Sequence, residues 1–344
     1  MKVLLTGSHG YLGSVTGRVL ADAGHEVVGF DALLYEGCDL PGAGEDGARP
    51  ALVRDVRDVT APDLAGVDAV VHLAALSNDP IGELSPQLTR AINFEASVSL
   101  ARAAREAGAS RFVFASSCSM YGASDTDELV DEQAPLRPLT AYAESKVLAE
   151  EALAGLADDG FSPVFMRNAT AYGVSPRLRL DIVLNNLVAW AFTTGRVKIM
   201  SDGTPWRPLV HVEDIALATA ALLAAPRDVV HAEAFNVGGS EENYQVRELA
   251  EIARDVGDAE VELAGSGDPD PRSYRVSFAK LARALPDLRL RWTARTGAEE
   301  LVAAYRAAGL TLEEFEGDRY VRLRRIDALR ARGELDETLR RVPA

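Results

Sequence analysis

The chain has 344 residues, of which 47% are hydrophobic and 26% charged, enough for one large α/β domain with additions or for two domains. Its 52 acidic residues outnumber 36 basic ones, and the formal net charge of −16 disfavours nonspecific binding to nucleic acids and anionic membranes. Two cysteines without metal-ligand spacing predict neither a disulfide framework nor a metal site. Without an apolar span or a signal-peptide layout, we expect a cytoplasmic protein.

Short apolar runs alternate with longer helical stretches through the first half of the chain. The runs expected to be strands are residues 2–6, 26–31, 51–54, 68–73, 111–116 and 163–167. The stretches expected to be helices are residues 11–23, 86–107 and 140–157. Strands that are almost continuously apolar and separated by helices indicate a parallel sheet covered on both faces. We therefore predict a doubly wound α/β domain over residues 1–168.

The regular alternation ends after residue 168. Residues 169–207 carry turn signals and an Asn-rich helix, whereas 211–225 and 234–237 have the patterns of one more helix and strand. We expect the chain to return to the first domain at about 208–238. Residues 169–207 and 239–310, with a helix at 246–256 and turns at 265–271, would form a smaller substrate domain above the carboxyl ends of the strands.

Residues 311–344 form an amphipathic extension in which Tyr320, Leu323, Ile326 and Leu329 recur every three residues. An apolar stripe is costly to leave in water, at about 25 cal/mol per Å² of apolar area. We expect this helical extension to pack on its own chain near the substrate domain.

Glycines follow the first predicted strand and open the first helix. Gly7 permits a tight turn, Gly10 lets the backbone approach a pyrophosphate, and Gly13 lets helix and strand pack closely. The second strand ends at Asp31, 24 residues after Gly7, where a carboxylate can accept both adenosine ribose hydroxyls. Because this carboxylate repels a 2′-phosphate, and positions 32–35 carry no Arg or Lys, we predict NAD rather than NADP.

Asp55 and Val56 follow the third predicted strand. They are candidates for contact with the adenine edge, and a helix N-cap is an equally good interpretation of Asp55.

A second group of polar residues belongs to the reacting end. Tyr142 and Lys146 lie four residues apart in a predicted helix, which places the phenol and the ammonium on one face. The strand at 111–116 ends in a run of hydroxyls that includes Ser117 and Ser119. Together these residues indicate proton transfer at the carboxyl edge of the sheet.

The combination resembles the extended short-chain dehydrogenase/reductase family, specifically its nucleotide-sugar epimerase/dehydratase branch with the UDP-glucose 4-epimerase-like members. The resemblance covers about residues 1–310 and implies a Rossmann-type fold. The matching positions are Thr6-Gly7-x-x-Gly10-x-x-Gly13, His72-Leu73-Ala74-Ala75, Asn93, the segment from Ser117 to Tyr121-Gly122, Tyr142-x-x-x-Lys146, and the stretch from Asp202-Gly203 through Arg207 to Val210-His211-Val212 and Asp214.

The resemblance implies a role for each matching residue. A free tyrosine with a pKa of about 10 is a poor base at neutral pH. Lys146 and a positive nicotinamide would lower the pKa of Tyr142, and Ser117 would donate to the same substrate oxygen. The implied NAD contacts are Gly7, His9, Gly10, Tyr11, Leu12, Gly13, Asp31, Asp55, Val56, Leu73, Ala74, Ala75, Tyr142 and Lys146. The implied contacts with a nucleotide-diphosphate sugar are Ser77, Ser117, Ser119, Thr170, Arg177, Arg179, Asn186, Arg207 and Arg272. Relatives usually carry Asn where Thr170 stands, so the sugar contact there departs from the pattern.

The residues after Ser117 distinguish the reactions of the branch. By resemblance, 4,6-dehydratases carry an Asp-Glu pair there and decarboxylating members carry Glu at the position of Ser119, whereas this chain has Cys118 and Ser119. Members that epimerise C3 and C5 carry a cysteine at the position of Ser119, so Cys118 is interpreted as a packed thiol. His72 and His211 belong to scaffold motifs and are expected to be structural.

These departures favour a 4-epimerase that oxidises the sugar transiently at C4. A reductase of nucleotide-linked 4-keto sugars is the close alternative, a 4,6-dehydratase or a hexuronate decarboxylase is a weaker one, and a dinucleotide-sensing binding protein is the non-enzyme alternative. The resemblance also implies a homodimer formed through the helices at 86–107 and 140–157.

Overall fold

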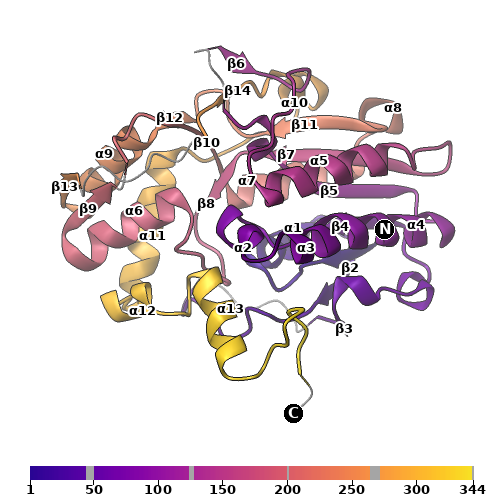
Figure 1. Cartoon of the computed structure of the whole chain (residues 1–344). Helices are drawn as coiled ribbons and strands as arrows, with labels where there is room; N and C mark the ends of the chain where they lie inside the picture. The colour runs from indigo at the N-terminus through magenta and orange to yellow at the C-terminus, as the bar shows by residue number, and fades with distance from the viewer. Residues whose placement is uncertain (44–49, 124–127, 200, 264–271, 343–344) are drawn as a thin grey trace.

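The computed structural model describes residues 1–43, 50–123, 128–199, 201–263 and 272–342. A seven-stranded parallel sheet with the order β11-β7-β5-β4-β1-β2-β3 forms its centre (Figure 1). The predicted doubly wound fold is confirmed. The strands are β1 (Lys2–Thr6), β2 (Glu26–Asp31), β3 (Leu52–Val53), β4 (Ala69–His72), β5 (Arg111–Ser117), β7 (Ser162–Asn168) and β11 (Glu233–Val237).

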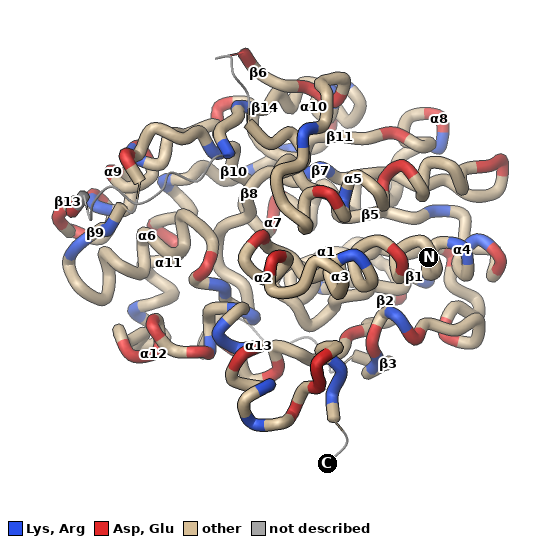
Figure 2. Tube along the Cα trace, in the orientation of Figure 1, with Lys and Arg blue, Asp and Glu red and all other residues tan. Residues whose placement is uncertain are grey.

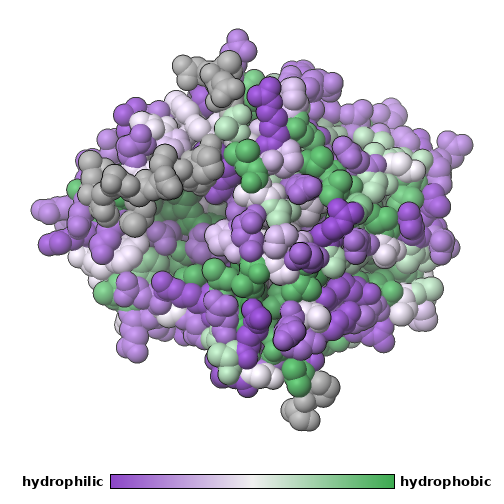
Figure 3. Space-filling model, viewed as in Figure 1, coloured by the Kyte–Doolittle hydropathy of each residue, from purple (hydrophilic) through white to green (hydrophobic). Residues whose placement is uncertain are grey.

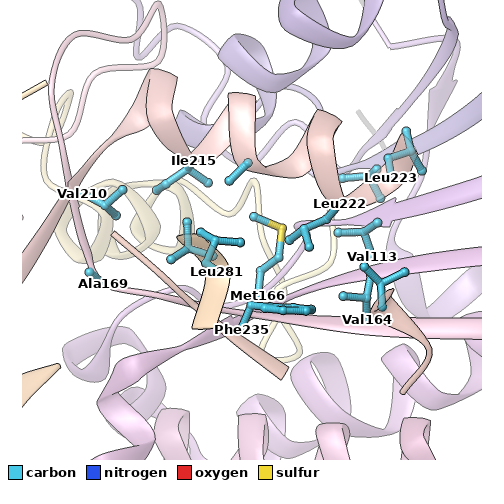
Figure 4. Close-up of a cluster of buried hydrophobic side chains, with 14 of the residues drawn as sticks. Val113, Val164, Met166, Ala169, Val210, Ile215, Leu222, Leu223, Phe235 and Leu281 are labelled. Atoms are coloured by element: carbon cyan, nitrogen blue, oxygen red, sulfur yellow. The ribbon is translucent and has the colours of Figure 1, made fainter. Parts of the chain in front are cut away.

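Helices cover both faces of this sheet, which explains why its strands are apolar almost throughout. Val3 and Val113 pack in a cluster with Ile215 and Leu222 on one face, whereas Leu4 packs in a second cluster on the other. Figure 4 shows Ile215 and Leu222 pointing from their helix toward the side chains of the strands. The covering helices are α1 (Tyr11–Asp22) with α7 (Val212–Ala224) and, opposite them, α4 (Ala96–Glu106) with α5 (Ala141–Ala154).

The helix predicted over 86–107 is interrupted by a π-helical turn. It consists of α3 (Pro86–Thr89), η3 (Arg90–Glu95) and α4, and the π turn carries Asn93. The Asn93 amide accepts from the Leu76 N–H at 2.8 Å and donates to the Leu76 carbonyl at 3.1 Å and to Ser145 Oγ at 3.2 Å. The irregular turn therefore connects the loop after β4 to α5, and both line the site described below.

A smaller part of the molecule lies beside the carboxyl ends of the strands. It has its own apolar cluster, formed mainly by α6, α9 and α11. The elements of this part are β8 (Thr170–Tyr172), α6 (Val183–Thr194), β9 (Arg196–Ile199), β10 (Trp206–His211), β12 (Asn243–Gln245), α9 (Val246–Gly257), β13 (Glu260–Leu263) and α11 (Ala294–Ala308). This separate cluster supports the proposed division of the chain into two domains. The predicted turns at 265–271 lie outside the described residues.

The remaining elements of the described chain are mostly short. They are η1 (Val56–Asp58), η2 (Ala61–Leu64), α2 (Asp79–Leu84), η4 (Cys118–Tyr121), β6 (Leu129–Val130), α8 (Arg227–Val230), β14 (Arg275–Val276), α10 (Ala279–Ala284), α12 (Leu312–Glu316) and α13 (Arg322–Ala331). On the face seen in Figure 3, hydrophilic residues dominate and apolar residues are interspersed. Among the described residues, no helix is long and apolar enough to cross a membrane, and no three His, Cys, Asp or Glu side chains form a group able to hold a metal ion.

The C-terminal extension packs on its own chain, but not only on the substrate side. Tyr320 belongs to the cluster of the smaller part, whereas Ile326 and Leu339 belong to the cluster beneath the central sheet. Tyr320 also precedes α13 rather than lying on it. The extension therefore bridges the two parts, as the yellow segment in Figure 1 shows. The sequence pattern could not indicate this, because a stripe of apolar residues does not specify its partner.

Candidate active site

The predicted site residues surround one cavity of about 630 Å³ at the carboxyl ends of β1, β4 and β5. The order of the sheet reverses between β1 and β4, which is where open α/β sheets bind ligands. All of the predicted residues except His9 and Arg177 line this cavity. His9 contributes its backbone N–H to Asp31, and Arg177 forms an ion pair with Asp39.

The glycine turn brings three backbone segments close together. Gly7 has a φ of +70°, and a Cβ there would lie 2.8 Å from the Ala74 nitrogen. A Cβ on Gly13 would lie 1.9 Å from the Gly7 oxygen. At its first turn α1 has neither a side-chain cap nor an acidic residue. Its first N–H groups and the helix dipole are therefore suited to an anionic ligand.

Asp31 is held ready to accept further hydrogen bonds. One carboxylate oxygen accepts from the His9 N–H at 2.9 Å, and the other accepts from the Leu33 N–H at 2.7 Å. Burial raises the pKa of Asp31, and these two hydrogen bonds oppose the rise. Each oxygen retains acceptor capacity on the cavity side, as contact with two ribose hydroxyls requires.

Asp55 matches the interpretation as an N-cap, while it also lines the cavity. Its side chain caps η1 by accepting from the Arg57 N–H at 2.9 Å and forms an ion pair with the Arg57 guanidinium at 2.6 Å. Arg54, at the same end of the cavity, pairs with Asp63 at 2.8 Å.

The candidate catalytic residues come from two adjacent elements. Lys146 is only 3% exposed, and its Nζ donates to the Ala115 carbonyl at 2.7 Å and lies 5.8 Å from the centre of the Tyr142 ring. Ser117, at the end of β5, lies close enough to the Tyr142 hydroxyl to oppose the rise in its pKa, and it donates to Ser119 Oγ at 2.9 Å. The structure thus brings the phenol, the ammonium and two hydroxyls to one wall of the cavity.

The pKa values of this pair differ from the expected activation of the tyrosine. Burial and the charge of Asp79 raise the pKa of Tyr142 to about 12, against the opposing hydrogen bond with Ser117. Burial lowers the pKa of Lys146 to about 7, and Glu150 opposes this shift. In this geometry the proton therefore stays on the tyrosine, because desolvation disfavours the charged form of both groups.

Asp79 was not predicted as a site residue, although it lines the cavity at the start of α2. It accepts from Thr140 Oγ1 at 2.5 Å and forms an ion pair with Arg272. Asp79 therefore connects Thr140, the N-cap of α5, to Arg272, an arginine predicted to hold the substrate diphosphate.

A second polar network lines the middle of the cavity. Arg179 donates to Asp181 at 2.9 and 3.1 Å and to Ser77 Oγ at 3.2 Å, and Asp181 accepts from Asn78 at 2.7 Å. Asn186 uses its amide to bond the Leu180 carbonyl at 2.8 Å. Arg179 therefore already has an acidic partner within the protein.

The remaining candidates are structural. Cys118 donates to the Arg167 carbonyl at 3.1 Å and does not line the cavity, and burial raises its pKa well above the usual range. His72 lies between Thr6 Oγ1 at 2.6 Å and Ser97 Oγ at 2.8 Å, and His211 pairs with Glu300 at 2.9 Å.

Several other residues that line the cavity were not predicted from the sequence. These are Tyr35, Asn78, Asp79, Asp181, Lys198 and Arg322. Asn78 and Asp79 follow a predicted strand closely, and that position was a usable signal. Arg322 had none, because an arginine between apolar positions of an amphipathic helix reads as solvent-facing.

The residues present fit a dinucleotide. The cavity extends from Asp31 past the uncapped start of α1 to Tyr142 and Lys146, and it holds a buried guanidinium nitrogen of Arg322 that has no hydrogen-bond partner among the described residues. A carboxylate for ribose hydroxyls, free N–H groups for a pyrophosphate and a lysine for the second ribose are the groups that such a ligand requires.

Comparisons with known proteins agree with this geometry. The NAD dependent epimerase/dehydratase family matches residues 3–238. A UDP-glucose 4-epimerase of Corynebacterium glutamicum is 30% identical over 292 residues, covering 78% of this chain and 85% of the relative. MoeE5 in complex with UDP-glucose and NAD superposes with a TM-score of 0.77 at 27% identity, covering 90% of this chain and 100% of MoeE5. A double mutant of DesIV, a dTDP-glucose 4,6-dehydratase from Streptomyces venezuelae, with NAD bound, superposes with a TM-score of 0.78 at 26% identity, covering 89% of this chain and 97% of DesIV.

Proposed function

Because the chain belongs to the NAD dependent epimerase/dehydratase family, we propose that it is an NAD-dependent enzyme that oxidises and re-reduces a nucleotide-diphosphate sugar at C4, acting as a 4-epimerase. The observation that carries this proposal is the placement of Ser117, Tyr142 and Lys146 on one cavity wall, next to Ser119 rather than an acid. The relatives named UDP-glucose 4-epimerase support the choice of reaction.

Bound NAD would supply the acceptor, and later the donor, of the C4 hydride together with a positive charge near the phenol. Tyr142 would take the proton of the C4 hydroxyl. After the keto sugar has rotated to present its other face, C4 would take back the hydride and Tyr142 would return the proton to the C4 oxygen. The sugar and the cofactor therefore undergo no net oxidation or reduction. Ser117 would hold the C4 oxygen through its hydroxyl. Lys146 would stabilise the phenolate electrostatically and bind the nicotinamide ribose.

The other end of the cavity suits the diphosphate of the substrate. Arg207 and Arg272 line it, and planar guanidinium groups form paired hydrogen bonds with phosphate oxygens. In binding, Arg272 would exchange its ion pair with Asp79 for one with the diphosphate. Thr170 lines the cavity at the position where relatives usually carry Asn, so it would offer a shorter side chain to the sugar.

The assignment of a 4-epimerase over a dehydratase depends on positions 118 and 119. Removal of water across C5 and C6 requires an acid and a base beside the sugar. The Cys118 thiol bonds the Arg167 carbonyl away from the cavity, and Ser119 offers only a hydroxyl. Asp79 is paired with Thr140 and Arg272, so we assign it a positioning role rather than proton transfer.

The decisive experiment is product analysis by NMR and mass spectrometry after incubation with UDP-, dTDP-, GDP- and CDP-hexoses and hexuronates. We expect interconversion of C4 epimers, with no net change in absorbance of the cofactor, and no release of water or CO₂. Stoichiometric consumption of NADH with a 4-keto sugar would instead indicate the reductase. Release of water would indicate the dehydratase, and release of CO₂ would indicate the decarboxylase. NAD binding without turnover across the panel would indicate a dinucleotide-sensing protein. The Tyr142→Phe variant provides the matched control.

The proposal includes a homodimer in the cytoplasm, with α4 and α5 at the interface. Light scattering of the purified protein at several concentrations measures the oligomeric state, and a monomer at all of them would contradict this part of the proposal.

A further inference from the structure

The C-terminal extension reaches the dinucleotide end of the cavity. Its helix α13 contacts α2, and Leu339 lines the cavity within the cluster that contains Phe30 and Val56. The extension is held there by several hydrogen bonds and ion pairs to the chain around β2 and β3. These join Arg57 to the Thr338 carbonyl, Arg340 to Asp58, Arg341 to the Leu33 carbonyl and Arg325 to the Glu36 carbonyl.

Arg322, the first residue of α13, is the basic residue that this arrangement buries. Its side chain is 1% exposed and lines the cavity, with the guanidinium 4.2 Å from the centre of the Tyr35 ring. One terminal nitrogen, Nη2, donates to the Arg177 carbonyl at 2.8 Å. The other, Nη1, is buried and has no hydrogen-bond partner among the described residues. Arg325, another basic residue of α13, lies 3.9 Å from Asp318. Figure 2 shows basic and acidic residues mixed along the C-terminal extension.

The charge of Arg322 is not balanced within the described part of the chain. Its neighbour Arg179 holds Asp181 through two hydrogen bonds, whereas no described carboxylate lies within ion-pair distance of Arg322. Burial lowers the pKa of Arg322, and the charge of Arg179 lowers it further. An unpaired buried guanidinium is costly, so a ligand that brings negative charge would remove a defect of the folded protein.

The position of Arg322 in the cavity indicates which anionic ligand it would bind. Tyr35 follows Asp31 by four residues, and the charges of Arg179 and Arg322 act on Tyr11, the first residue of α1. Arg322 therefore lines the same cavity as Asp31, the carboxylate that suits a ribose, and as the start of α1, which suits a phosphate. Arg207 and Arg272, by contrast, lie together at the far end, where Arg207 donates to the Arg272 carbonyl and Arg272 pairs with Asp79.

We propose that Arg322 binds the pyrophosphate of the dinucleotide, and that the C-terminal extension is therefore a part of the cofactor site. The inference rests on the proposed binding of NAD and assigns to the extension, which lies outside the matched family region, a direct contact with that ligand. Nη1 would donate to a phosphate oxygen while Nη2 keeps the Arg177 carbonyl. Leu339 would cover the adenosine end.

The test compares ligands that carry successive parts of the dinucleotide. Adenosine, ADP and NAD, together with UDP as the nucleotide of the proposed substrate, are titrated by calorimetry into wild-type protein freed of bound nucleotide, and into the Arg322→Gln and Arg322→Lys variants. Arg330→Gln is the matched control, because it makes the same change at an exposed position of the same helix. We expect Arg322→Gln to weaken ADP and NAD about tenfold to a hundredfold, the effect of losing a charged hydrogen bond. Adenosine affinity should not change, Arg322→Lys should recover part of the loss, and Arg330→Gln should bind as the wild type.

Each other outcome has a definite meaning. Unchanged ADP and NAD affinity in Arg322→Gln would overturn the inference, and so would an equal loss for adenosine, which would show a structural role only. A loss of UDP affinity with NAD affinity intact would place Arg322 in the substrate site instead. If the wild-type protein itself bound no NAD, the proposed function would fail first, and this result is separate from the response of Arg322→Gln.

Discussion

Replacement of Tyr142 by Phe removes the hydroxyl proposed to carry the proton and leaves the rest of the ring in place. The centre of the ring lies 5.8 Å from Lys146 Nζ, and Ser117 lies close enough to its hydroxyl to act on its pKa. The variant should therefore fold and bind NAD as the wild type does, while losing turnover.

The size of the loss follows from the pKa values. With a pKa of about 12 for Tyr142, the phenolate is present at about one part in 10⁵ at pH 7, and forming it costs about 7 kcal/mol. The enzyme has to recover this free energy from positive charge at the phenol during the reaction. A positioned general base contributes about 10² to 10⁴ in rate, so kcat should fall by at least about 10²-fold.

The assay is the rate of C4 epimer interconversion followed by NMR, together with NAD titration of each variant. Tyr121→Phe is the matched control, because the Tyr121 hydroxyl donates to Asn236 at 2.7 Å behind the cavity wall. Tyr121→Phe should lower the free energy of unfolding by about 1 kcal/mol and leave kcat near the wild-type value. A Tyr142→Phe enzyme within threefold of the wild-type kcat would refute the assignment of the base.

Three further changes test other parts of the structure. Asp31→Ala should weaken NAD binding about tenfold to a hundredfold and narrow the preference over NADP, since it removes a charged acceptor of ribose hydroxyls; a wild-type enzyme that binds NADP more tightly in calorimetry contradicts this. Truncation after Leu310 removes several buried side chains, each of which contributes about 1.5 to 3 kcal/mol to stability, so the melting temperature should fall sharply while the oligomeric state stays the same. Conversion of a dimer to a monomer in light scattering would show instead that the extension forms the interface. Burial lowers the pKa of His72 to about 3, whereas the pKa in the unfolded chain is 6.5. Between these pH values only the unfolded state binds a proton at His72, so the free energy of unfolding should fall by about 1.4 kcal/mol per pH unit from pH 6.5 toward pH 3. Urea unfolding at pH 7 and pH 5 measures this slope, and a His72→Asn variant with the same slope as the wild type would exclude His72 as its source.

Local sequence patterns predicted the central sheet and the nucleotide turn well. Strands buried on both faces must be apolar throughout, and the turn between β1 and α1 tolerates only glycine where a Cβ would meet backbone. Tyr142 and Lys146 were found together because helical spacing alone puts them on one face. The position of Asp31 was predictable because a strand of known length ends there.

Other parts of the site were not accessible to such patterns. Asn93 was recognised only as a family position, and its role became clear from the π turn that aims its amide at Leu76. The helix α11 was not predicted, although Thr293 forms a capping box at its start. Asp79 reads as an ordinary residue at a helix start, until the fold brings Thr140 and Arg272 beside it.

The sequence by itself predicted the strands and helices of the sheet in their order along the chain, the glycine turn, the position of Asp31 at the end of a strand, and the Tyr142 and Lys146 pair. Each of these features depends on residues close together along the chain. Only the tertiary structure determined where the C-terminal extension packs. Arg322 stands in a helix whose pattern places arginines in solvent, and it is buried because Tyr35 and the Arg177 carbonyl, far away in sequence, close over it. Burial of a charge is a property of contacts between distant segments, and no local periodicity encodes which segments will meet.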